Sequence, residues 1–143
     1  MAWKISSSVR PIPESEAKGK VADIYRDIKD TKKLDHVPNF WRVLATNPDH
    51  LEMIWTRLKA LMHPEAAGRK TRLDPATREA IALAVSATNG CAYCINSHTA
   101  ALRKLGMDPE TLGEVLAIAG LFNTTNTLAD AYQVEPDILP PVD

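Results

Sequence analysis

The stretch LDPATREAIALAVSATNGCAYCINSHTAALRKLG, residues 73–106, predicts two helices joined by a tight turn. Asp74 followed by Pro75 is an N-cap with a proline at the first helical position, a pair that marks a helix start. Gly90 is typical of the residue that ends a helix, and Gly106 is expected to end the next one. With its turn at Gly90, the stretch is expected to form an antiparallel helical hairpin.

The sequence before this hairpin predicts further helices. Apolar residues at helical spacing mark residues 17–28 and 51–62, and a short helix is expected around residues 40–44. Asn47 stands directly before a proline and repeats the cap signal in front of the second of these stripes. Each segment therefore has a helical period and a recognisable start or stop.

The sequence after the hairpin completes an all-helical pattern. Asp108 precedes another proline and is expected to open a helix that continues to Tyr132, followed by VEPDILPPVD, a proline-rich segment expected to be extended. No alternation of apolar and polar residues is bounded by turn signals, so the predicted fold class is all-α. The helix opened at Pro75 is apolar almost all round and is expected to be central and buried.

Length and composition indicate one globular domain covering residues 1–143. The formal net charge of −1 gives no reason to expect nucleic acid or an anionic membrane as a partner. The start, MAWKISSSVR, lacks the apolar core of a signal peptide, and no apolar run reaches membrane-spanning length. We therefore expect a cytoplasmic protein, in which a close cysteine pair is more often catalytic, redox-sensing or metal-binding than a permanent crosslink.

Both cysteines of the chain lie in the second helix of the hairpin, beside a histidine. Cys91, Cys94 and His98 occupy positions i, i+3 and i+7 and therefore share one helix face. Leu102 and Leu105 continue that face, so we expect it to pack against the protein. Cys91 is expected in the first helical turn, where free backbone N–H groups lower the pKa of a thiol. His98 lies one turn beyond Cys94, the spacing for a thiol–imidazole hydrogen bond.

Glu79 can be placed opposite His98 by counting from the turn. It lies eleven residues before Gly90, so in an antiparallel hairpin it is level with residues 98–101 of the second helix. A carboxylate in this apolar stretch is costly without a partner, and His98 is the nearest candidate. The sequence therefore predicts that Glu79, His98 and Cys94 form a base-assisted thiol.

The cysteine pair has several other interpretations. Haem attachment needs a histidine directly after the second cysteine, where this chain has Ile95. A zinc site could take Cys91, Cys94, His98 and Glu79, although the chain has no second cysteine pair. A thioredoxin-like site is expected beside strands, and none is predicted. Two buried cysteines and a buried histidine without a chemical role are the structural alternative.

The pattern E-(x11)-C-A-Y-C-I-N-S-H, residues 79–98, resembles the signature of the alkylhydroperoxidase D (AhpD)-like proteins in the carboxymuconolactone decarboxylase superfamily. It is most similar to their peroxidase-related branch, and VPNFWRVLATNP, residues 37–48, extends the similarity. The resemblance implies an AhpD-like helical bundle that assembles as trimers or hexamers. It also implies that peroxide is reduced without a metal, haem or flavin cofactor.

The resemblance further implies a role for each site residue. Cys94 would attack the peroxide and Cys91 would capture the oxidised sulfur as a disulfide, which an external dithiol donor such as a dihydrolipoamide- or thioredoxin-like protein would reduce. His98 and Glu79 would relay protons. The best-studied members carry a histidine where this chain has Tyr93, a phenol that relays protons poorly at neutral pH. The decarboxylase branch lacks the cysteine pair, so lactone decarboxylation is not expected.

Three functions remain as hypotheses from the sequence. The first is a thiol peroxidase acting on small organic hydroperoxides. The second is a dithiol–disulfide oxidoreductase or redox sensor that acts on a protein partner. The third is a zinc-bound or purely structural helical module.

Overall fold

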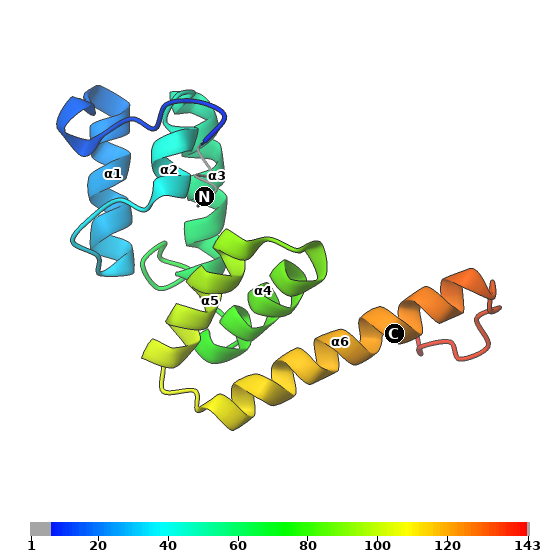
Figure 1. Cartoon of the computed structure of the whole chain (residues 1–143). Helices are drawn as coiled ribbons and strands as arrows, with labels where there is room; N and C mark the ends of the chain where they lie inside the picture. The colour runs from blue at the N-terminus through cyan, green and yellow to red at the C-terminus, as the bar shows by residue number, and fades with distance from the viewer. Residues whose placement is uncertain (1–6, 143) are drawn as a thin grey trace. The chain divides into compact units, whose positions relative to one another are not determined.

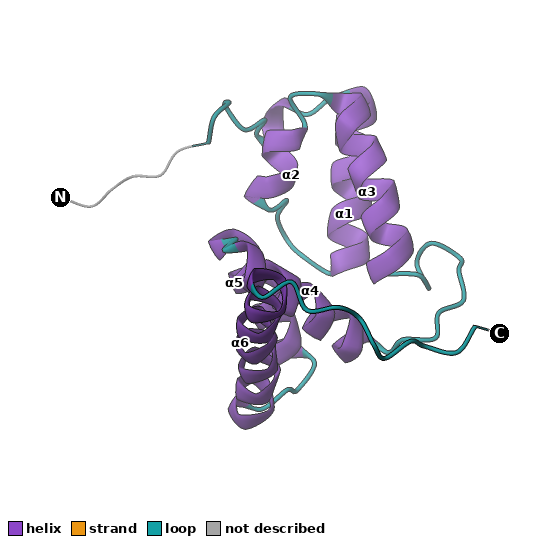
Figure 2. Ribbon diagram, turned by 90° about the vertical axis from the view of Figure 1, so that its right-hand side faces the viewer, coloured by secondary structure: helices purple, strands orange, loops and turns teal. Residues whose placement is uncertain are grey.

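The structure is a computed structural model that describes residues 7–142. Its elements in chain order are a short 3-10 helix, η1 (Glu14–Glu16), and six α-helices: α1 (Gly19–Lys32), α2 (Asn39–Leu44), α3 (Pro48–Met62), α4 (Pro75–Asn89), α5 (Ala92–Lys104) and α6 (Pro109–Ala131) (Figure 1). Residues 7–142 contain no strand, as Figure 2 shows, and residues 134–142 have no regular structure. The predicted all-α class is confirmed, and the extended conformation expected after α6 stays a prediction.

The chain divides into two compact units, Met1–Arg72 and Leu73–Asp143. The first holds α1 to α3 and the second holds α4 to α6. The expectation of a single domain over residues 1–143 stays a prediction.

The core of the first unit is built from aromatic and aliphatic side chains of α1, α2 and α3. Trp41 and Trp55 are buried and meet edge to face, with ring centroids 5.2 Å apart. The Trp55 indole donates to Asp27 at 2.7 Å, and Lys59 lies 2.8 Å from the same carboxylate. These bonds join α1 to α3 at the edge of the core.

In the second unit α4 is the central helix, because it contacts both α5 and α6. Asp74 and Asp108 cap α4 and α6 as predicted, each accepting a backbone N–H bond, from Thr77 at 2.9 Å and from Thr111 at 2.8 Å. Leu83 of α4 and Leu102 of α5 are fully buried between the helices. The second unit is thus a three-helix layer with its core along α4.

Two expectations about burial are wrong within this chain. Ile81 and Val85 of the helix expected to be buried all round are more than half exposed, and Leu105 is half exposed instead of continuing the packed face. Two neighbouring helices cover only two sides of α4, so its third side faces outward. No residue of α6 is buried, although it is the longest helix at 23 residues, and Figure 1 shows it extending beyond the α4–α5 hairpin.

Candidate active site

The site is built at the turn between α4 and α5. Gly90 adopts the left-handed conformation with φ of 68°, which a glycine reaches without strain. Its N–H donates to the Ala87 carbonyl at 3.2 Å, and the Cys91 N–H donates to the Ser86 carbonyl at 3.0 Å. This pair of bonds is a Schellman motif, which ends α4 and sets the starting direction of α5.

Ser86 is a site residue that the sequence reasoning missed. It is buried, its hydroxyl donates to the Ala82 carbonyl at 2.6 Å, and its carbonyl holds the Cys91 N–H. Ser86 therefore positions Cys91 through the backbone. The available signal was a single serine within the otherwise apolar run of residues 80–87.

Cys91 and Cys94 are joined by a disulfide, with their Cα atoms 5.3 Å apart. This distance lies within the usual range for a disulfide and agrees with residues one helical turn apart. The expectation that Cys91 lies in the first turn of this helix is wrong, because α5 begins at Ala92 and Cys91 is its N-cap. Its Sγ accepts a hydrogen bond from the Cys94 N–H at 3.3 Å. The Cys91 sulfur therefore fills the place of a capping oxygen.

The predicted partnership of Glu79 and His98 is confirmed. Glu79 Oε2 lies 2.6 Å from His98 Nδ1, and the two side chains are only 14% and 24% exposed. A carboxylate that accepts from Nδ1–H leaves Nε2 of a neutral imidazole as its basic nitrogen. The pair joins α4 to α5 and orients the imidazole.

His98 lies four residues beyond Cys94 on α5, so both side chains share one helix face. The thiol–imidazole hydrogen bond expected between Cys94 and His98 stays a prediction for the reduced protein, because the Cys94 sulfur is in the disulfide here. Tyr93 lies between the cysteines and its ring is exposed. The hairpin therefore brings Glu79, His98, Cys94 and Cys91 together, with Tyr93 at the outer side.

The described part of the chain has neither a metal-binding cluster nor a membrane-spanning helix. Within residues 7–142, no group of three or more histidine, cysteine and carboxylate side chains is arranged to hold a metal ion. No helix in the same range has the length and apolar character needed to cross a membrane.

The fold and the site together define a class of protein. It is an all-helical protein that carries a disulfide-bonded cysteine pair and a hydrogen-bonded glutamate–histidine pair on one helical hairpin. Residues 48–134, more than half of the chain, match the carboxymuconolactone decarboxylase family. The chain belongs to this family, and its helices and relatives make it AhpD-like within it.

A crystal structure of the alkylhydroperoxidase AhpD core from Rhodospirillum rubrum is similar with 42% identity and a TM-score of 0.83. The match covers 92% of this chain and 94% of that one. The alkyl hydroperoxide reductase AhpD of Streptomyces avermitilis is 46% identical over 52 residues, which are 36% of this chain and 29% of that protein. The AhpD of Brucella anthropi is 29% identical over 135 residues, 91% and 73% of the two chains. The chain thus spans less than a third of the Streptomyces relative it matches.

Proposed function

We propose that the protein is a thiol-dependent peroxidase that reduces small organic hydroperoxides through Cys94 and Cys91. The observation that carries this proposal is a disulfide between two cysteines one helical turn apart, on the hairpin that also holds the hydrogen-bonded Glu79–His98 pair. Relatives named alkyl hydroperoxide reductase support the same reaction class. The carboxymuconolactone decarboxylase family name also covers another activity, but a disulfide-bonded pair has its natural use in thiol redox chemistry.

The first step oxidises Cys94. Its thiolate attacks one oxygen of the peroxide O–O bond, the bond breaks, and the leaving alkoxide takes a proton to become an alcohol. Sulfur loses two electrons and Cys94 becomes a sulfenic acid. In this scheme His98, oriented by Glu79, first takes the thiol proton at Nε2 and then gives it to the alkoxide.

The second and third steps return the site to its dithiol form. The Cys91 thiolate attacks the Cys94 sulfenic sulfur, the S–S bond forms, and hydroxide leaves and is protonated to water. An external dithiol donor, a dihydrolipoamide- or thioredoxin-like protein, then gives two electrons by two thiol–disulfide exchanges. The donor becomes a disulfide and both cysteines become thiols again.

The exposed Tyr93 favours a second candidate function. A phenol in place of a relay histidine would slow proton delivery to the alkoxide without hindering exchange with a protein disulfide. The second candidate is therefore a dithiol–disulfide oxidoreductase or redox sensor for a protein partner. The third, a zinc-bound or structural module, differs from both in binding zinc or in lacking thiol reactivity.

Assembly and location belong to the same proposal. The unburied apolar side chains of α6 support a trimer or hexamer, and the redox-active pair fits a reducing, cytoplasmic setting. The match of the Rhodospirillum core over 92% of the chain supports treating residues 1–143 as one AhpD-like domain.

The test is the consumption of an organic hydroperoxide with dihydrolipoamide and with reduced thioredoxin as alternative donors. The peroxidase proposal expects turnover with at least one donor, and loss of turnover in Cys94→Ser. Reduction of a protein disulfide without hydroperoxide turnover would favour the second candidate. One tightly bound zinc ion per chain, with no peroxide reaction, would favour the third.

A further inference from the structure

One face of α3 carries a depression that the core of the first unit does not use. It has a volume of about 770 Å³ and is lined by α3 side chains, among them Met53, Arg57 and Leu61, and by Arg69 from the loop after α3. We call it the α3 groove. Leu51 and Trp55 of the same helix are buried and face the core, so the groove is the outward side of the helix.

The floor of the α3 groove is apolar and uncovered. Met53 is 69% exposed and Leu61 is 56% exposed. Covering two such side chains removes apolar surface from water, which favours association. The floor therefore fits a ligand with apolar side chains.

The rim of the α3 groove is positively charged. Among the described residues, neither Arg57 nor Arg69 has a carboxylate partner, whereas the groove's acidic residue, Glu52, is held by Lys20 at 2.7 Å. Two arginines beside a neutralised glutamate attract an acidic ligand. The α3 groove thus fits a segment that combines carboxylates with apolar residues.

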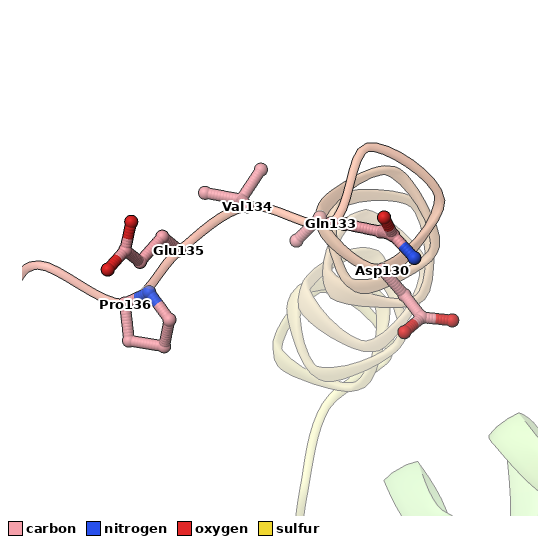
Figure 3. A pocket seen from close by; sticks show the side chains of 6 residues that line it. Asp130, Gln133, Val134, Glu135 and Pro136 are labelled. Atoms are coloured by element: carbon pink, nitrogen blue, oxygen red, sulfur yellow. The ribbon is translucent and has the colours of Figure 1, made fainter.

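The segment after α6 has this combination. In residues 134–142, which we call the post-α6 segment, Ile138 is 90% exposed and Leu139 is 78% exposed. Val134 is 62% exposed, and Glu135 and Asp137 alternate with Val134, Pro136 and Ile138 along the segment. Figure 3 shows Val134, Glu135 and Pro136 leading away from the end of α6 with their side chains outside the helix. Prolines at 136, 140 and 141 restrict the backbone conformations of the unbound segment. Less conformational entropy is therefore lost when the segment binds.

The two surfaces also match in length. Met53 and Leu61 are eight residues apart on α3, so they are about 12 Å apart along the helix axis. Val134 to Ile138 in an extended polyproline-type conformation spans about 12 Å as well. Five residues of the post-α6 segment can therefore run the length of the α3 groove.

We propose that the α3 groove binds the post-α6 segment of a second copy of this chain. Glu135 and Asp137 pair with Arg57 and Arg69, while Val134 covers one of Met53 and Leu61 and Ile138 covers the other. A second copy is the occupant because every residue from Gly120 to Ala131 of α6 is exposed, directly ahead of the segment. A copy that covers this helix therefore also meets the segment that follows it. The inference does not depend on the peroxidase proposal.

Photo-crosslinking of the full chain tests the contact. Leu139 is replaced by benzoylphenylalanine in unlabelled chains, which are mixed with equal amounts of ¹⁵N-labelled wild-type chains and irradiated. Mass spectrometry is expected to find unlabelled post-α6 peptides joined to ¹⁵N peptides of residues 53–69. Crosslinks to other regions, or crosslinks to residues 53–69 that never contain ¹⁵N, would overturn the proposal.

Charge reversal tests the pairing. Arg57→Glu with Arg69→Glu turns two attractive pairs into repulsive ones, which should lower the crosslink yield about tenfold. Adding Glu135→Lys with Asp137→Lys should restore the yield, which a misfolded variant could not do. The control, Lys70→Glu with Arg72→Glu, changes the charge of the same loop equally at residues that do not line the groove. An equal loss in both double variants, or no loss in either, would contradict the pairing.

Discussion

At the turn between α4 and α5 the two sulfurs have different surroundings. Cys91 Sγ caps α5 and accepts the Cys94 N–H, whereas Cys94 shares its helix face with His98. A backbone N–H at a helix start stabilises a thiolate without a base, while an imidazole must first take a proton. In the proposed division of roles, His98 activates Cys94 for attack on the peroxide and Cys91 resolves the oxidised sulfur.

The first prediction separates the two cysteines. Cys94→Ser should abolish reaction with a hydroperoxide, because no activated thiol remains. Cys91→Ser should react once and stop at a sulfenic acid, which excess peroxide oxidises further because no thiol captures it. Intact-mass spectrometry after one equivalent and after excess peroxide distinguishes these states. Single-turnover reaction in Cys94→Ser, with none in Cys91→Ser, would reverse the assignment.

The second prediction concerns the Glu79–His98 pair. Glu79→Gln and His98→Ala should each slow the reaction of Cys94 with peroxide at neutral pH by about 10²- to 10⁴-fold, the usual contribution of a general base. The loss should shrink above about pH 8.5, where an ordinary thiol ionises without help. Stopped-flow rates from pH 6 to 10 measure this.

Ser97→Ala is the control for these two variants, since Ser97 is an exposed neighbour of His98 on α5. It should retain the rate profile of the wild type. Superimposable profiles for wild type, Glu79→Gln and His98→Ala would show that the pair does not activate Cys94, leaving it a structural link between α4 and α5.

At the scale of the elements, capping aspartates start two of the three helices of the second unit, α4 and α6. Backbone N–H bonds from Thr77 and Thr111 hold the pKa of Asp74 and of Asp108 below the ordinary aspartate value. A carboxylate whose pKa is lowered in the folded state stabilises that state above the unfolded pKa, about 3.9. This contribution is lost as the pH falls through the lower folded-state pKa.

The third prediction follows from that sign. Asp74→Asn with Asp108→Asn keeps an accepting oxygen at each cap but removes the charge, so the variant should be less stable than the wild type at pH 7. The difference should close as the pH falls below about 4, where the wild-type carboxylates are protonated. Urea midpoints between pH 2 and 7 measure it. Asp30→Asn, at an exposed aspartate that caps no helix, is the control, and a pH-independent difference would contradict the capping role.

At the scale of the whole molecule, the exposed apolar surface of α6 is the main feature that this chain leaves uncovered. Leu121, Phe122 and Leu128 are each about half exposed, and no α6 side chain is buried. Helices in a single soluble chain normally bury one apolar stripe. Association with other copies is the arrangement that would cover it, in agreement with the expected homo-oligomer.

The fourth prediction is that the wild type has a solution mass several times that of the 15.7 kDa chain. Leu121→Asp with Phe122→Asp should shift it to smaller species, because each lost apolar contact is worth about 1.5–3 kcal/mol, or about 10- to 100-fold in association. Light scattering after size exclusion measures the mass. Thr125→Asp adds charge to the same exposed helix without removing an apolar group. A wild-type monomer at micromolar concentration would contradict the prediction.

What the sequence by itself determined is local. The helix starts at Asn47, Asp74 and Asp108 could be predicted because a cap depends on the side chain and the N–H three residues later, and all three bonds are present. The spacing of Cys91, Cys94 and His98 follows from 3.6 residues per turn. Even the Glu79–His98 contact could be predicted. In two antiparallel helices joined by a short turn, residues at similar counts before and after the turn lie level with each other.

What only the tertiary structure decided is burial and the exact start of α5. Ile81, Val85 and Leu105 carry the same apolar pattern as Leu83 and Leu102, yet the first three are exposed and the last two are buried. An apolar residue is buried only if another element lies opposite it, and that element can come from far along the chain or from another copy. The place of Ser86 under Cys91 likewise depends on the Schellman turn, since its carbonyl becomes a partner only when Gly90 turns the chain back.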